Sequence, residues 1–117
     1  MMVQSSPENG SLREGIFSIP LHGPVAMATV PEIRKVLLGA AKKRAVKEIR
    51  IDFSRVSRLD TSGVAMLVET WRGLARRGGA LRLSGLSENA KRLIQLARLD
   101  QIFEIRDEAG SGIENGS

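Results

Sequence analysis

Ile49-Arg50-Ile51-Asp52-Phe53 is followed, after six intervening residues, by Asp60-Thr61-Ser62-Gly63, and this stretch decides the fold. The first run alternates apolar and polar residues, which predicts a strand with Ile49, Ile51 and Phe53 on one face. Residues 54–59 are interpreted as a loop. Apolar residues then recur at helical spacing, at Val64, Leu67, Val68, Trp71 and Leu74. This spacing predicts a helix of about four turns that ends at Gly78-Gly79.

The segment before this stretch predicts a strand and a helix. Residues 16–21 form an apolar run that ends at His22-Gly23-Pro24, which indicates a strand. Thr29 and Glu32 match a T-x-x-E capping box, and Pro31 falls in the first turn, where its missing N–H costs nothing. The apolar face of this helix is predicted to comprise Ile33, Val36, Leu37 and Ala40, with Lys42-Lys43-Arg44 closing the helix.

The segment after Gly79 continues the alternation of strands and helices. Residues 80–84 predict a short strand, and Ser87 is placed to cap a further helix whose buried stripe comprises Ala90, Leu93, Ile94 and Ala97. Residues 102–105 predict a last short strand. Such alternation predicts an α/β fold with one mixed, mainly parallel sheet of four to five strands and right-handed crossovers.

The length of 117 residues suits one domain. Residues 1–14 are rich in Ser, Pro, Asn, Gly and Glu and are interpreted as a disordered tail, residues 15–108 as the domain, and residues 109–117 as a flexible tail. No apolar run approaches the roughly 18 residues of a membrane span, and residues 1–14 contain no apolar signal-peptide core. We therefore expect a cytoplasmic protein that does not span a membrane.

The chain carries a formal net charge of +5. Basic residues gather at Lys42-Lys43-Arg44 and at Arg76-Arg77, which raises the possibility of nucleic-acid binding. Aromatic residues that could stack on bases amount to only 3% of the chain. We therefore interpret the two runs as solvated helix ends, where cations meet the negative end of the helix dipole, and expect no direct contact with nucleic acid.

The residues that usually carry enzymatic chemistry are scarce. The chain has no cysteine and one histidine, His22, which stands before a Gly-Pro turn. Neither the phosphate-binding loop nor the dinucleotide fingerprint occurs, and the carboxylates show no spacing typical of metal ligands. We expect no enzymatic activity, no catalytic residue, no cofactor and no metal.

Asp60-Thr61-Ser62-Gly63 is the strongest candidate for a functional site. It stands where a chain leaving a sheet enters a helix, so Asp60 or Thr61 is placed to cap the first free N–H groups. The positive end of a helix also suits an anion, including a phosphate carried by a hydroxyl. A plain N-cap without further function remains the alternative at this level.

The order of these motifs resembles the STAS family over roughly residues 15–105. The resemblance rests on the strand at 49–53, the D-T-S-G loop, the helix to Gly78-Gly79, the strand at 80–83 and the helix from Ser87. In the anti-sigma factor antagonist branch, the hydroxyl residue after the Asp is phosphorylated by a partner kinase that is also the anti-sigma factor. The resemblance therefore implies that Thr61 is a phosphoacceptor.

The same resemblance assigns roles to the neighbours of Thr61. Asp60 would orient the loop, Ser62 would support it, and Gly63 would let a partner approach closely. Arg55 and Arg58, on the expected loop at 54–59, would join Thr61, Ser62 and Gly63 in the partner-binding surface.

One position departs from the family pattern. The family usually has G-x-[LIV]-D after the first strand, and this chain has Gly23-Pro24-Val25-Ala26, so the acid is replaced by Ala26. This departure bears on kinase recognition. It keeps open a second reading, a non-enzymatic STAS subunit of an Mla-type lipid-transport ABC complex that contacts the ATPase or permease without being phosphorylated. A nucleotide- or phospholipid-binding module is a third.

Overall fold

The sheet has five strands in the order β1-β2-β3-β4-β5, in a computed structural model that describes residues 10–106. Strands β2 to β5 are parallel, and β1 pairs antiparallel with β2. The elements are β1 (Ser11–Arg13), β2 (Ile16–Val25), α1 (Val30–Ala41), β3 (Glu48–Leu59), α2 (Thr61–Ala75), β4 (Ala80–Ser84), α3 (Glu88–Leu96), a 3₁₀ helix (Leu99–Gln101) and β5 (Glu104–Arg106). The predicted mixed, mainly parallel α/β fold is confirmed.

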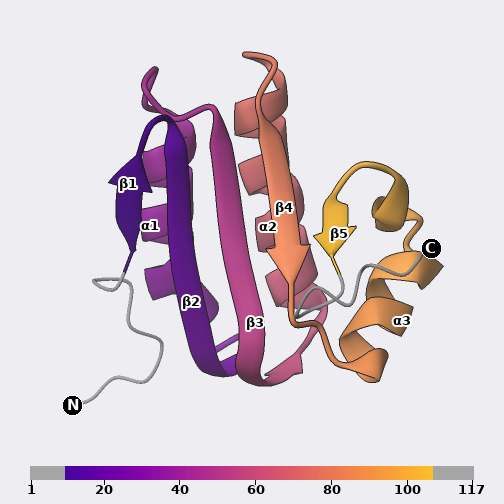
Figure 1. Cartoon of the computed structure of the whole chain (residues 1–117). Coiled ribbons are helices and arrows are strands. Elements are labelled where there is room, and N and C mark those ends of the chain that lie inside the picture. The colour runs from indigo at the N-terminus through magenta and orange to yellow at the C-terminus, as the bar shows by residue number, and fades with distance from the viewer. Residues whose placement is uncertain (1–9, 107–117) are drawn as a thin grey trace.

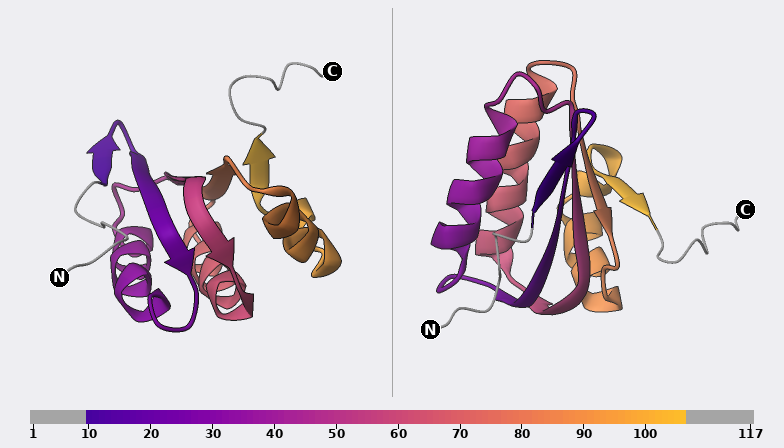
Figure 2. Two further views of the ribbon diagram at one scale, coloured as in Figure 1. Left: turned by 90° about the horizontal axis from the view of Figure 1, so that it is seen from below. Right: turned by 60° about the vertical axis from the view of Figure 1, so that its left-hand side comes forward.

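Helices α1 and α2 lie side by side on one face of the sheet, as Figures 1 and 2 show. Because each crossover joins neighbouring parallel strands in the same direction, a constant handedness places both helices on the same side. Helix α3 lies near β5, at the opposite end of the sheet from α1 (Figure 1). Within residues 10–106, none of the helices combines the length and apolarity needed to cross a membrane.

The core lies between the sheet and these helices, as the alternation at 49–53 predicts. Ile49, Ile51 and Phe53 are at most 2% exposed, and Leu67 of α2 is fully buried. The other face of the sheet carries charged side chains in ion pairs, with Arg82 contacting Glu48 at 3.2 Å and Glu104 at 2.7 Å. Half-buried and exposed ion pairs of this kind contribute little stability. Most of the stability of the sheet therefore comes from burial of its apolar face.

Residues 54–59 were expected to form a loop, and this prediction is wrong because β3 continues to Leu59. The second half of β3 pairs with the end of β2, with register shifts between Pro20 and His22 and between Gly23 and Pro24. Such irregularities insert unpaired residues and disrupt the alternation of faces. The period-two pattern is therefore lost in the sequence although the strand persists.

The folded domain begins before residue 15, because residues 11–13 of the predicted tail form β1. A two-residue turn joins β1 to β2, with positive φ at Glu14 (51°) and Gly15 (85°). Positive φ at both central residues is the requirement of a type I′ hairpin turn. All three residues of β1 are exposed, so no apolar pattern marks the strand. The rest of the predicted tails, at 1–9 and 109–117, lies outside the described residues.

The predicted start of α3 is confirmed, and the predicted start of α1 is confirmed for Pro31 but not for the Thr29 capping box. Ser87 caps α3 as expected, accepting a hydrogen bond from the Ala90 N–H at 3.1 Å, and Pro31 stands in the first turn of α1. The capping box at Thr29 is wrong, because its hydroxyl donates to the Pro24 carbonyl at 2.7 Å. Thr29 has a helical φ and ψ, whereas an N-cap side chain reaches the helix from an extended residue.

The last strand starts two residues later and ends one residue later than predicted. The strand expected at 102–105 is observed as β5 at Glu104–Arg106, after the 3₁₀ helix. Phe103 is 2% exposed and belongs to the core. The short segment has too few residues for a periodic signal to fix its ends.

Candidate functional site

The candidate site lies where the start of α2 meets the carboxyl-terminal ends of β2 and β3, at the bottom of Figure 1. The Asp60 N–H donates to the Val25 carbonyl at 3.2 Å and so joins the end of β3 to the end of β2. Asp60 is the N-cap of α2, and Thr61 is its first helical residue. The prediction that Thr61 stands at a helix start is confirmed.

Asp60 organises the start of α2 through one carboxylate oxygen. Its Oδ1 accepts hydrogen bonds from the Ser62 N–H at 2.9 Å, the Gly63 N–H at 3.1 Å and the Ser62 hydroxyl at 2.6 Å. An extended backbone at Asp60 (φ −111°, ψ −176°) points the side chain at these donors. The carboxylate thereby occupies two of the free N–H groups that would otherwise be available to an external anion.

The second oxygen of Asp60 ties the site to the loop after β2. Its Oδ2 accepts a hydrogen bond from the Met27 N–H at 3.2 Å. The hydrogen bond from the Ser62 hydroxyl lowers the pKa of the Asp60 carboxyl below its ordinary value. Partial desolvation raises this pKa, but the N–H groups of Gly63, Met27 and Ser62 lower it further. The carboxylate is therefore ionised near neutral pH and bridges two loops that are 33 residues apart in the sequence.

Gly63 has a packing role that differs from its prediction. It is buried, and a Cβ at this position would stand 2.6 Å from Leu59 Cδ1 and 2.9 Å from the Val25 carbonyl oxygen. Real Cβ atoms do not approach other atoms so closely. Glycine here allows α2 to approach the ends of β2 and β3, so the close approach expected for a partner is made inside the domain.

The two hydroxyls of the site have different environments. The Ser62 hydroxyl donates to Asp60 and is part of the cap. Thr61 is exposed, and within residues 10–106 its hydroxyl makes no hydrogen bond to another residue. Of the two, Thr61 is the side chain open to chemistry from outside.

Arg55 and Arg58 lie on the irregular half of β3 and not on a loop. They pair with His22 and Pro24 of β2, and both are exposed. The structure thus places two cations on the strand that leads directly to Asp60. The carboxylate, the exposed hydroxyl and the two arginines stand within seven consecutive positions, 55–61.

The loop from Ala26 to Thr29 belongs to the site, and its exposed residue, Met27, is not among the predicted site residues. Met27 is 76% exposed, although its N–H is held by Asp60. Ala26 is 4% exposed, and its carbonyl accepts from the N–H groups of Thr29 and Val30, both at 2.8 Å. Met27 lies in a strand-to-helix loop and outside the periodic pattern of either element. This position is the sequence signal that could have indicated an exposed apolar residue.

We predict that Asp60→Ala destabilises the domain by about 1–2 kcal/mol near neutral pH, because α2 loses its N-cap. Since the pKa of Asp60 is lower in the folded state than in the unfolded chain, this stabilisation is complete above the unfolded value of about 3.9. It is lost as the pH falls through the folded pKa. Urea unfolding of the wild type and the Ala variant at several pH values measures the difference.

Asp60→Asn is the matched control, because it keeps an acceptor oxygen and removes the charge. The Asn variant should be less destabilised than the Ala variant, and its stability should lack the acid-dependent contribution of Asp60. A gap between wild type and Ala that stays constant down to about pH 2 would contradict the assigned role of the carboxylate.

No group of three or more His, Cys, Asp or Glu residues within 10–106 is arranged to hold a metal ion. Asp60 is the single acidic residue among residues 53–68 of the sequence, and residues 15–31 contain none. The site thus offers one carboxylate, one exposed hydroxyl and adjacent cations, which suits binding and modification better than acid–base chemistry by paired carboxylates.

A comparison with protein families matches the STAS domain over residues 11–111. Among curated proteins, the anti-sigma-B factor antagonist of Bacillus subtilis is 28% identical over 101 residues, covering 86% of this chain and 91% of that protein. The anti-sigma-B factor antagonist of Listeria monocytogenes is 31% identical over 88 residues, covering 75% and 76%.

Solved structures show the same fold. The anti-sigma factor antagonist SpoIIAA in its unphosphorylated form superposes with a TM-score of 0.71 at 24% identity, covering 86% of this chain and 87% of the other. The phosphorylated form of the Bacillus protein SpoIIAA gives a TM-score of 0.71 at 25% identity, covering 85% and 87%. The fold therefore occurs in a protein that has been solved in both states.

Proposed function

Because the chain belongs to the STAS domain family, in its anti-sigma factor antagonist branch, we propose that it binds an anti-sigma factor that is also a kinase and that phosphorylation of Thr61 releases this partner. The domain acts by binding and contributes no catalysis of its own. We further propose that it works in the cytoplasm, where such a partner would hold a sigma factor.

One observation carries the proposal: Thr61 is exposed and its hydroxyl makes no hydrogen bond within the described residues, whereas the neighbouring Ser62 hydroxyl donates to Asp60. A kinase needs an accessible hydroxyl. The two solved forms of SpoIIAA support a phosphorylation switch in this fold.

The physics of the site explains how a phosphate would act as a switch. A phosphothreonine carries about −1.5 to −2 charges. Asp60 already holds the N–H groups of Ser62 and Gly63, and its negative charge repels a second anion. The phosphate would therefore project outward, into the surface on which the partner docks, rather than settle on the helix start.

The docking surface that we propose comprises Thr61, the exposed part of Ser62, Arg55 and Arg58, together with Met27 from the loop after β2. Gly63 supports it from inside. Because Ala26 replaces the usual acid and is buried, the loop at residues 26–29 offers no second carboxylate beside Asp60 for recognition by the kinase. Recognition would rest on the exposed Met27 and the two arginines.

The experiment is to capture partners from a native extract on the immobilised chain, add ATP, and locate phosphate by mass spectrometry. We expect capture of one anti-sigma kinase and phosphate on Thr61, with none on Thr61→Ala and with phosphate still found on Thr61 in Ser62→Ala. Capture of an ABC ATPase or permease, with no phosphate under any condition, would instead select the subunit of a lipid-transport complex.

A further inference from the structure

Two basic runs that are far apart in the sequence meet at the amino-terminal ends of the strands, at the top of Figure 1. The Arg77 guanidinium donates to the carbonyls of Val46, at 3.1 Å, and Ala41, and so joins the loop after α2 to the loop after α1. We call the cations gathered here the basic pole, which comprises Lys42, Lys43, Arg44, Lys47, Arg76 and Arg77. It lies at the opposite end of the strands from Thr61 (Figure 1).

The basic pole accounts for the net charge of the chain. Removing its six cations from the 18 Lys and Arg residues leaves 12, against 13 Asp and Glu residues. All six are exposed, and within residues 10–106 none forms an ion pair with a carboxylate. The C-termini of α1 and α2 point toward the pole, but each contributes only about −0.5 charge. The helix ends therefore neutralise about one of six charges.

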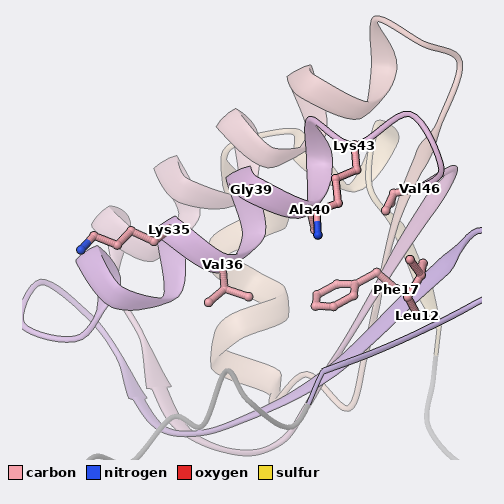
Figure 3. Close-up of a pocket in the computed structure, with 8 residues that line it drawn as sticks. All are labelled: Leu12, Phe17, Lys35, Val36, Gly39, Ala40, Lys43 and Val46. Atoms are coloured by element: carbon pink, nitrogen blue, oxygen red, sulfur yellow. The ribbon is translucent and has the colours of Figure 1, made fainter.

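An apolar slot opens beside the basic pole, between α1 and the β1–β2 hairpin. It has a volume of about 380 Å³ and is lined by the apolar side chains of Leu12, Phe17, Val36, Ala40 and Val46, by Gly39, and by two lysines, Lys35 and Lys43, of which Lys43 belongs to the pole. Figure 3 shows Phe17 and Val36 directed into the same space. Leu12 is 45% exposed, and Gly39 leaves space, because a Cβ there would meet nothing within 4 Å.

We propose that the basic pole binds the surface of an anionic lipid bilayer and that the slot beside it receives hydrocarbon from a lipid chain. Each Lys or Arg near an anionic membrane strengthens binding roughly fivefold, so six unpaired cations suffice for a reversible attachment. Such attachment would leave Thr61 and its surroundings directed away from the membrane. It is independent of the proposed switch.

The slot favours a bilayer over a nucleic acid. Both ligands offer a polyanionic surface, but only a bilayer also offers hydrocarbon that could fill a cavity lined mainly by aliphatic and phenyl groups, with two lysines beside them. Single-stranded nucleic acid would require aromatic side chains for stacking beside the cations. Among the residues that the structure describes, Phe17 is the single aromatic that lines the slot, and it faces the interior of the slot (Figure 3).

The test is co-sedimentation of the purified chain with vesicles of phosphatidylglycerol and phosphatidylcholine at low salt, compared with phosphatidylcholine alone. We expect binding only to the anionic vesicles, and weaker binding as salt is added. Lys42→Gln with Arg44→Gln should reduce binding by about 25-fold. The matched control, Arg92→Gln with Arg106→Gln, removes the same charge from exposed positions outside the pole and should change it by less than about threefold.

Gly39→Leu tests the slot separately. Leu is a better helix former than Gly and meets no atom near its Cβ, so the variant should fold with an equal or higher melting temperature. By filling the slot it should weaken vesicle binding severalfold. Equal loss in the pole and control variants would contradict the proposal, as would binding to an oligonucleotide but not to vesicles, or binding to neither.

Discussion

Leu67→Asp is expected to abolish the cooperative folding of the domain. Leu67 is fully buried in α2 against the sheet, within a core that includes Ile49 and Ile51. The substitution removes most of the Leu side chain from the packed core, which alone costs about 2–5 kcal/mol, and adds a carboxylate with no partner. A whole domain is stable by only about 5–15 kcal/mol. Thermal and urea unfolding measured by circular dichroism check this expectation.

Ala65→Asp is the control for Leu67→Asp, since Ala65 is exposed on the same helix. It introduces the same charge and should change stability by less than about 1 kcal/mol. If Leu67→Asp unfolded at the wild-type temperature, the assignment of the buried face of α2 would be overturned.

Thr61→Glu is expected to weaken partner binding at least about tenfold. The variant places one negative charge at the exposed first residue of α2, where we propose that the partner docks. An unpaired charge carried into an interface loses its solvation without compensation. Glutamate carries less charge than a phosphate and lacks its geometry, so phosphothreonine should act more strongly. Partner affinity measured by calorimetry checks this prediction.

Thr61→Ala separates a phosphoacceptor from a contact group. If the hydroxyl only accepts phosphate, the Ala variant binds nearly as well as the wild type. If the hydroxyl itself bonds to the partner, its loss leaves a buried group unpaired and costs about 1–3 kcal/mol. Asn89→Glu, exposed in the first turn of α3, is the control for a charge at a helix start elsewhere. If both Thr61 variants bound the partner with wild-type affinity, Thr61 would have no role in partner binding and would only be the residue that follows the N-cap.

The elements with strong local signals could be predicted from the sequence. Three local patterns each predict an element from a short stretch of sequence: the alternation at 49–53, the helical spacing from Val64 to Leu74 and the Ser87 cap. The structure confirms all three elements. The place of Thr61 at a helix start followed because a strand, a turn and a helix succeed one another around Asp60.

The remaining features depend on contacts that no local pattern records. The second half of β3 is held by pairing with β2 across register shifts, so its residues lack alternation. The first strand, β1, forms because a hairpin turn at Glu14 and Gly15 reverses the chain and lets β1 pair with β2. The hydrogen bond that the Met27 N–H donates to Asp60 spans 33 residues. Each of these is a property of the assembled sheet and not of a sequence window.

The proposed switch is tested by measuring the affinity of the captured anti-sigma kinase for the wild-type chain before and after phosphorylation in vitro, with Thr61→Ala carried through the same treatment. Phosphorylation should weaken binding of the wild type by more than about tenfold, and the same treatment should leave the affinity of the Ala variant unchanged. An unchanged affinity of the fully phosphorylated wild type, or an equal loss in the Ala variant, would contradict the proposed switch.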